Sequence, residues 1–211
     1  MSEVVLFDYW RSSASYRVRI ALNLKGIAYR AVPTDLVADA QKAPDYVARN
    51  PQGFVPMLCI DDHDLTQSLA IIDYLDATRP EPRLLPTDPA SRAQTLARAM
   101  IVIADTHPLN NLRMLRYLKN QLGQEQAAID DWYRNWVAEG FVALEALAPQ
   151  AGLFGGDQPD LADVCLVPQM SNARRFELDL APYPRLTRID AALQEIAAFA
   201  AAHPDAVKAA E

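Results

Sequence analysis

Serine hydroxyls gather at the point where the first predicted strand turns into the first predicted helix. Ser12 and Ser13 lie there, directly after Arg11. A serine at a helix start is ordinarily an N-cap, which accepts a hydrogen bond from a backbone N–H group. The same position combines free N–H groups with the positive end of the helix dipole, so a serine hydroxyl there can also bind an anion such as a thiolate. Because binding the thiolate in preference to the thiol lowers the pKa of that thiol, the pattern allows either a cap or a thiol-activating site.

Three short segments further along carry groups suited to binding a peptide or a carboxylate. Val55-Pro56 lies ahead of a strand, where a proline is often structural and sometimes cis. We predict the cis form, which leaves the N–H and C=O groups of Val55 free to pair with an extended peptide. Gln67 and Ser68 open a helix, where Ser68 is either an N-cap or part of a carboxylate site. Gln52 lies in a predicted turn, from which its amide can bond a ligand.

A second group of polar residues lies within a long helical pattern in the second half of the chain. His107 precedes a proline, which kinks a helix and frees carbonyl groups, and Asn111 and Arg113 follow. His107 and Asn111 at such a kink are ordinarily local hydrogen-bond partners. Arginines that face a cleft are costly without an anionic ligand, which is one reading of Arg113 and Arg175. The other reading of Arg175 is a helix cap or a surface ion pair with a nearby carboxylate.

The elements that must position these groups follow a β-α-β-α-β-β-α order over roughly the first 80 residues. Strands are predicted at residues 4–8, 27–33, 57–60 and 64–66, and helices at 13–25 and 68–78. Three prolines between residues 80 and 86 mark a linker, after which the pattern is helical, with helix starts predicted at Asp88-Pro89 and at Asp160. The sequence therefore predicts an α/β domain over residues 1–82 and an all-helical domain over residues 88–211.

The composition is that of a globular chain with its own core, and it excludes several partner classes. With 211 residues, 51% of them hydrophobic, the chain needs neither a metal nor a disulfide framework. A net charge of −7 argues against nucleic acid as a partner. The longest apolar run, residues 196–202, is too short for a membrane span, and the N-terminus does not resemble a signal peptide, so we expect a cytoplasmic protein. Cys59 and Cys165 are expected to be buried thiols of a reducing compartment.

Several motifs, taken together, resemble the zeta class of the glutathione transferase family. The matching segments are residues 11–22, Val55-Pro56, residues 67–75, residues 83–86, the capping motif at Asp160 and residues 166–169. The resemblance covers essentially the whole chain. It implies the α+β two-domain glutathione transferase fold, with an N-terminal thioredoxin-like α/β domain followed by an all-α domain. It also implies glutathione as the cofactor and a homodimer as the assembly.

The resemblance further implies which residues bind glutathione. Ser12 and Ser13 would hold its thiolate. Val55 would bind the cysteinyl backbone of glutathione. Gln67 and Ser68 would bind its γ-glutamyl carboxylate, with assistance from Gln52. These assignments come from matching positions in the family.

Residues of the predicted helical domain would complete the site. His107 and Asn111 match positions that face the bound ligands, and His107 would reach the active site of the second subunit. Three arginines resemble a set that grips the carboxylates of the substrate, namely Arg11, Arg113 and Arg175. The serine pair would then be catalytic together with Arg11 and Arg175.

The activity implied by the resemblance is a glutathione-dependent cis–trans isomerisation of a maleyl dicarboxylate. The substrate would be maleylacetoacetate, giving fumarylacetoacetate in aromatic amino-acid catabolism, or maleylpyruvate. A general glutathione-conjugating transferase and a non-catalytic glutathione-binding module are the rival readings. Ala14 stands where the zeta signature usually has cysteine, so side activities that need that thiol are not implied. Isomerisation needs no protein thiol.

Overall fold

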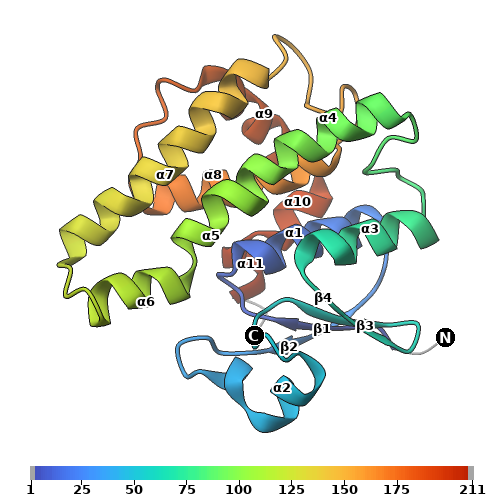
Figure 1. The fold of residues 1–211 in the computed structure, drawn as a ribbon. Coiled ribbons are helices and arrows are strands. Elements are labelled where there is room, and N and C mark those ends of the chain that lie inside the picture. Colours follow the sequence, from blue (N-terminus) through green and yellow to red (C-terminus); the bar gives the residue numbers. More distant parts are fainter. Residues whose placement is uncertain (1–2, 209–211) are drawn as a thin grey trace. The chain divides into compact units, whose positions relative to one another are not determined.

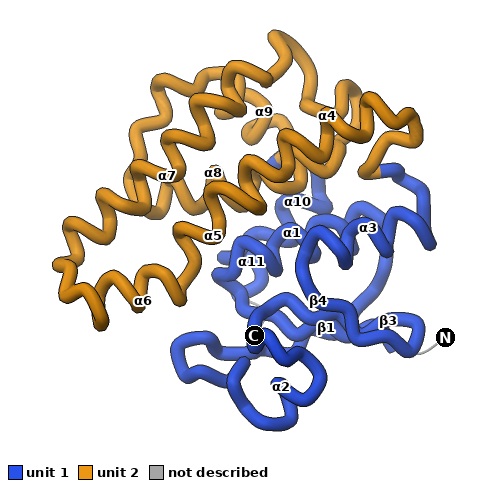
Figure 2. The backbone as a smooth tube through the Cα atoms, in the orientation of Figure 1, with its two compact units in different colours: residues 1–83, 194–211 blue, residues 84–193 orange. Residues whose placement is uncertain are grey.

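A computed structural model describes residues 3–208, and the chain divides into two compact units (Figures 1 and 2). Unit 1 contains the residues up to Arg83 together with those from Gln194 onward, and unit 2 contains Leu84–Leu193. The division near residue 83 lies next to the predicted boundary. The C-terminal segment differs from the prediction, because it packs with the N-terminal unit instead of continuing the helical one.

Unit 1 is built on a four-stranded sheet with the order β2-β1-β3-β4. The strands are β1 (Val5–Asp8), β2 (Arg30–Pro33), β3 (Met57–Ile60) and β4 (His63–Thr66). Strands β1 and β2 run parallel, whereas β3 is antiparallel to both β1 and β4. In this register Val5 lies opposite Arg30 on one side and Cys59 on the other. This is the thioredoxin-like arrangement that the family resemblance implies.

Helices lie on both faces of the sheet (Figure 1). Helices α1 (Ser13–Leu24) and α3 (Ser68–Thr78) cover one face, and the short helix α2 (Pro44–Arg49) lies on the other, beyond the 3-10 turn at Ala40–Lys42. Tyr46 of α2 packs its ring edge-on against Phe7 of β1 at 5.6 Å between ring centroids. Helix α1 begins at Ser13 and helix α3 at Ser68, two of the predicted site residues.

Local sequence signals explain where these elements end. Helix α1 stops at Gly26, whose φ of +63° is easy for glycine and closes the last turn. The β3–β4 hairpin turns at Asp61 and Asp62, which both have positive φ, 50° and 61°, as a tight two-residue hairpin turn requires. The turn and both flanking strands therefore follow from the residue types.

The C-terminal helices α10 (Ala197–Ala202) and α11 (Pro204–Lys208) complete unit 1. Two polar side chains of α1 reach carbonyl groups of α10. Asn23 donates from Nδ2 to the oxygen of Ala198, and Arg19 donates from Nε to the oxygen of Ala202, each at 3.0 Å. Phe199 is fully buried. These contacts explain why the segment packs with α1 and does not extend unit 2.

Unit 2 is helical. Its elements are α4 (Pro89–Met100), a π-helical segment (Ile101–Thr106), α5 (His107–Asn110), α6 (Leu112–Asn120), α7 (Gln126–Leu147), α8 (Leu161–Arg175) and α9 (Pro184–Gln194). The predicted N-cap at Asp88 is confirmed, because its carboxylate accepts from the N–H of Ser91 at 2.9 Å. No helix within residues 3–208 is long and apolar enough to cross a membrane.

The predicted capping box at the start of α8 is also confirmed. Asp160 accepts from the N–H of Asp163 at 3.2 Å, and Asp163 accepts in return from the N–H of Asp160 at 3.0 Å. The carboxylate of Asp163 additionally accepts from the N–H groups of Phe154 and Gly155, each at 3.0 Å. Burial, together with the charge of Asp160, raises the pKa of Asp163 to about 7.

Candidate active site

Ser12 and Ser13 stand at the start of α1, as predicted. Ser12 is the N-cap, and its Oγ accepts from the N–H of Ser15 at 3.2 Å. Ser13 is the first helical residue and is only 8% exposed. A serine hydroxyl carries one proton as well as acceptor lone pairs, so Ser12 can cap the helix and still donate to an anion. The two readings of this position are therefore compatible.

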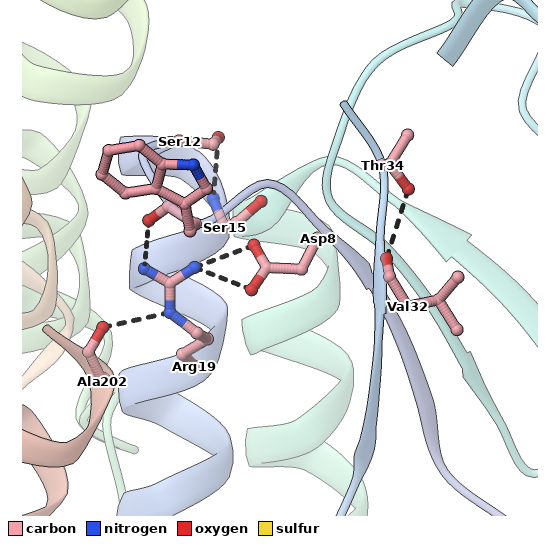
Figure 3. A network of polar contacts seen from close by, with 8 residues as sticks. Asp8, Ser12, Ser15, Arg19, Val32, Thr34 and Ala202 are labelled. Atoms are coloured by element: carbon pink, nitrogen blue, oxygen red, sulfur yellow. Dashed lines mark hydrogen bonds and ion pairs between the residues drawn. The ribbon is translucent and has the colours of Figure 1, made fainter. Parts of the chain in front are cut away.

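The turn that carries Ser12 is fixed from below by Arg19 (Figure 3). Its guanidinium donates to both carboxylate oxygens of Asp8 at 2.8 Å, to the carbonyl of Trp10 at 3.1 Å and to that of Ala202 at 3.0 Å. Arg19 and Asp8 are 1% and 2% exposed. The sequence reasoning missed this pair, although an arginine between Val18 and Ile20 in a helix was a signal for a buried charge with a partner.

The predicted carboxylate site at the start of α3 brings three of the proposed residues together. Gln67, in the N-cap position with a φ of 68°, makes no side-chain cap of its own. Its Nε2 donates to the Oε1 of Gln52 at 2.5 Å. Ser68 follows as the first helical residue, is 4% exposed, and accepts at Oγ from Arg17 at 3.0 Å. Arg17 is a contributor that sequence reasoning did not single out.

The Val55-Pro56 bond is cis, as predicted. Neither the N–H nor the C=O group of Val55 has a hydrogen-bond partner within the part of the chain that the structure describes. The loop before it is held through the carbonyl of Phe54, which accepts from Tyr46 Oη at 2.5 Å and from Asn50 Nδ2 at 2.7 Å. Burial raises the pKa of Tyr46 to about 12, so this hydroxyl remains a donor at neutral pH. Val55 thus presents a peptide edge from an anchored loop.

In unit 2, a π-helical segment precedes His107, which is half-buried at the start of α5. Asn111 is the N-cap of α6. Its Oδ1 accepts from the N–H of Met114 at 3.1 Å, and its Nδ2 donates to the carbonyl of Pro108 at 3.0 Å. These bonds give Asn111 the local role that the sequence allowed. Its role toward a ligand stays a prediction.

Arg175 is the last residue of α8 and is exposed. Its guanidinium carbon lies 4.8 Å from the ring centroid of Phe176 and 5.9 Å from that of Tyr133, and these two rings are stacked at 3.6 Å. It also donates to Asn172 Oδ1 at 3.2 Å. Among residues 3–208 no carboxylate pairs with it. The surface ion pair considered from the sequence is therefore absent from the described residues, and the guanidinium is held by aromatic rings and an amide.

The neighbouring arginines differ from Arg175. Arg174 forms an ion pair with the buried carboxylate of Asp190 at 2.5 Å. Arg113 is exposed on α6. Arg11 belongs to unit 1, is exposed, and lies over the rings of Trp10 and Tyr9 at 5.5 and 5.9 Å. The three arginines predicted to bind substrate are thus divided between the units, with Arg11 in unit 1 and the other two in unit 2.

Cys59 and Cys165 form no disulfide, and only Cys165 is buried as predicted. Cys165 is fully buried in α8. Cys59, in β3, is half-buried and accepts at Sγ from Arg49 at 2.8 Å. Burial and the adjoining carboxylate of Asp64 raise the pKa of the Cys59 thiol to about 11. The expectation of a buried Cys59 is therefore wrong, because Cys59 lies opposite Asp64 of β4, whose partly exposed ion pair with Arg49 borders the thiol.

Comparison with known proteins identifies the family. Residues 2–77 match the family model described as glutathione S-transferase, N-terminal domain. The chain is 51% identical over 210 residues to a maleylacetoacetate isomerase of Rhizobium meliloti (strain 1021), covering 98% of this chain and 99% of that protein.

Two solved structures extend the likeness to the fold. The holo structure of a maleylpyruvate isomerase, described as a bacterial zeta-class glutathione transferase, has a TM-score of 0.93 and 45% identity over 96% of this chain and 97% of its own. A maleylacetoacetate isomerase of Methylobacterium extorquens AM1, with bound malonate and glutathione, has a TM-score of 0.90 and 40% identity over the same shares, 96% and 97%. The chain therefore belongs to the glutathione transferase family and, within it, to the zeta class that its motifs predicted.

Proposed function

We propose that this protein is a glutathione-dependent cis–trans isomerase of a maleyl dicarboxylate. Its full-length likeness to a maleylacetoacetate isomerase supports this function. The structural observation that carries it is the start of α1, where the hydroxyl of Ser12 caps the helix and retains a proton to donate. Bound glutathione supplies a thiolate, whose reversible addition to the maleyl double bond turns it into a single bond that can rotate.

The residues of unit 1 fit glutathione. Ser12 and Ser13 would donate hydrogen bonds to its sulfur, and the positive end of the α1 dipole would favour the charged form. The backbone groups of Val55, which lack partners within the described residues, would pair with the cysteinyl part as an added strand. The γ-glutamyl carboxylate would be bound at the start of α3 by Ser68 and Gln67, with Gln52 holding the Gln67 amide.

The arginines would bind the substrate. Arg11, Arg113 and Arg175 present guanidinium groups, which match carboxylates in charge and in planar donor geometry. Arg175 lies over the Tyr133 and Phe176 rings and forms no ion pair with a carboxylate of the described residues, so it is suited to a substrate carboxylate. Charge at these positions would also stabilise the negative charge that the substrate gains as the double bond opens.

His107 and Asn111 complete the proposed site, and the assembly is proposed to be a homodimer in which His107 reaches the active site of the second subunit. The protein would work in the cytoplasm, in the degradation of tyrosine or other aromatic compounds. Sedimentation at micromolar concentration tests the dimer. A stable monomer would remove the role of His107 across the subunit boundary.

The test of the function is a set of steady-state rates with maleylacetoacetate and maleylpyruvate, each with and without glutathione. We expect isomerisation of at least one acid, and none without glutathione. Conjugation of chlorodinitrobenzene, an uncharged electrophile, is the rival activity. A conjugation rate that exceeds both isomerisation rates would favour a general transferase, and binding of glutathione with no turnover would favour a binding module.

The choice between the two acids remains part of the proposal. Similar proteins carry both names, since the Rhizobium relative is a maleylacetoacetate isomerase and one of the structural neighbours a maleylpyruvate isomerase. Both acids share the maleyl double bond and differ in the group attached to it. The ratio of the two kcat/KM values decides which is the better substrate.

A further inference from the structure

Arg17 contacts the first residue of α3 from the protein interior. It lies in α1 with 1% of its surface exposed, and its Nη1 donates to the Oγ of Ser68 at 3.0 Å. Ser68 begins α3 and is itself 4% exposed. The contact therefore joins the two helices that cover one face of the sheet, at the end of α3 where a carboxylate would bind.

The direction of this hydrogen bond is fixed by chemistry. A guanidinium has only donors, so the oxygen of Ser68 must be the acceptor. The hydroxyl proton of Ser68 is then left for another acceptor, and within residues 3–208 it has none. An ionised carboxylate has only acceptors, which makes it the complementary third member of the chain.

We propose that Arg17 is a positioning residue for the γ-glutamyl carboxylate of glutathione, acting through the hydroxyl of Ser68. Arg17 donates to Ser68, and Ser68 donates to the carboxylate. The hydroxyl group of Ser68 therefore lies between the guanidinium of Arg17 and the bound carboxylate. Because hydrogen bonds in a chain polarise one another, the guanidinium makes Ser68 a stronger donor than an isolated serine.

Burial strengthens this effect. A charge inside the protein is screened much less by water and salt than one at the surface. The guanidinium of Arg17 also lies next to the N-terminal end of α3, where the helix dipole favours the same sign of ligand charge. The neighbouring Gln67 and Gln52 amides supply only neutral donors. Arg17 would thus bring a full positive charge to this end of the site.

The test compares two ligands that differ only in the γ-glutamyl carboxylate. Glutathione is compared with 4-aminobutanoyl-cysteinyl-glycine, in which hydrogen replaces the γ-glutamyl carboxylate. Their dissociation constants are measured by calorimetry in the absence of substrate. We expect the wild-type protein to prefer glutathione by about tenfold or more, as for a hydrogen bond to a charged group.

Two substitutions of Arg17 separate its charge from its packing. In Arg17→Gln the charge is removed, and the preference for glutathione is expected to fall to within about threefold, with little change in affinity for the analogue. In Arg17→Lys a charged donor is kept, and most of the preference is expected to return. Ser68→Ala breaks the same chain at its other end, keeps the guanidinium in place and should also abolish most of the preference.

Arg19 provides the matched control, because it is as deeply buried in the same helix but donates to Asp8 instead of to Ser68. Arg19→Gln is expected to lower thermal stability and to leave the ratio of the two dissociation constants unchanged.

If Arg17→Gln lowers affinity for both ligands equally, the residue is merely structural and the proposal is overturned. If Arg17→Gln does not fold, the Ser68→Ala and Arg17→Lys variants decide. The proposal is contradicted if Ser68→Ala keeps the wild-type ratio of the two dissociation constants. It is also contradicted if Arg17→Lys loses the preference for glutathione.

This inference rests on the proposed binding of glutathione and not on the isomerase activity. Calorimetry without substrate keeps the two apart. A protein that binds glutathione with an Arg17-dependent carboxylate preference but isomerises neither acid would leave this inference standing and remove the proposed reaction. A wild-type protein that binds the analogue as tightly as glutathione would overturn the inference even if it is an isomerase.

Discussion

Arg19 and Asp8 form a two-point ion pair at 2.8 Å, with both side chains almost fully buried beneath the turn that carries Ser12. Arg19→Met would leave the carboxylate of Asp8 buried without its counter-charge. We therefore expect the free energy of unfolding to fall by about 3–5 kcal/mol, measured by urea denaturation. The control is Arg30→Met, which breaks the exposed Arg30–Glu3 pair and should cause no measurable loss. Equal losses in the two variants would contradict the difference in burial.

Ser12→Ala removes a hydroxyl that would donate to the glutathione thiolate. We expect the pKa of the bound thiol to rise and isomerisation at neutral pH to slow by about ten- to a hundredfold, with much of the rate restored at high pH. Ser13→Ala should act in the same direction. The thiolate is followed by its ultraviolet absorbance. Ser15→Ala is the control, since its hydroxyl is fully buried and its backbone N–H still bonds Ser12. Unchanged titrations in both Ser12 and Ser13 variants would remove the assignment.

Arg175→Ala tests the binding of substrate carboxylates. The loss of a guanidinium aimed at a carboxylate should lower kcat/KM for the maleyl acid by about thirtyfold or more, while conjugation of chlorodinitrobenzene stays nearly constant. Arg175→Lys should not restore the wild-type rate, because the planar donor geometry is lost. Arg174→Ala removes the neighbouring ion pair with Asp190 and should lower stability without changing the ratio of the two activities. Equal losses on both substrates in Arg175→Ala would indicate a structural arginine.

Gly140 lies in α7 against the π-helical segment that precedes His107. A Cβ at this position would lie 2.4 Å from Thr106 Oγ1, and that hydroxyl donates to the carbonyl of Ile101 at 3.0 Å. Although alanine favours a helix interior by about 1 kcal/mol over glycine, overpacking of this kind costs about 1–3 kcal/mol. We expect Gly140→Ala to be destabilised in urea denaturation, and addition of Thr106→Ala to recover part of the loss. If Gly140→Ala is instead stabilised, α7 can shift away from Thr106 without cost.

Asp163 should make stability depend on pH. Its pKa in the folded protein is raised to about 7, above the ordinary value of 3.8, by burial and by the charge of Asp160. The folded state therefore holds this proton more tightly than the unfolded chain does. The resulting stabilisation is fully present below about pH 4 and is lost as the pH rises through about 7. Urea denaturation at pH 5, 6 and 7 should show this fall, and the slope should be smaller in Asp163→Asn. Identical slopes would contradict the raised pKa.

Local signals were enough to predict many elements of this fold. Strand β3 occupies Met57–Ile60 as expected, because an apolar run is bounded by a proline and by an Asp-Asp turn. Helix α3 occupies Ser68–Thr78 for similar reasons. The break at Asn111, which starts α6 as a separate helix, was not predicted. A proline pattern indicates a kink but does not show that an asparagine further along caps a new helix.

The candidate site was predictable as a set of positions and not as a set of contacts. Ser12, Gln67 and Val55 came from helix starts and from a residue before a proline, which are local features. The burial of Arg17 and Arg19 depends on partners outside their own helix, at Ser68, Asp8 and Ala202. Helical spacing alone places both arginines on α1 without showing what they contact, so their roles required the structure.

The attachment of α10 to α1 has a consequence for synthesis on the ribosome. Helix α10 supplies the carbonyl groups that accept from Asn23 and Arg19, yet its residues are translated only after all of unit 2. When unit 2 has just left the exit tunnel of the ribosome, helix α1 of unit 1 is therefore not yet covered by α10. Unit 2, continuous in sequence, has all its residues available earlier. Although unit 1 begins the chain, it is the later of the two to be completed during translation.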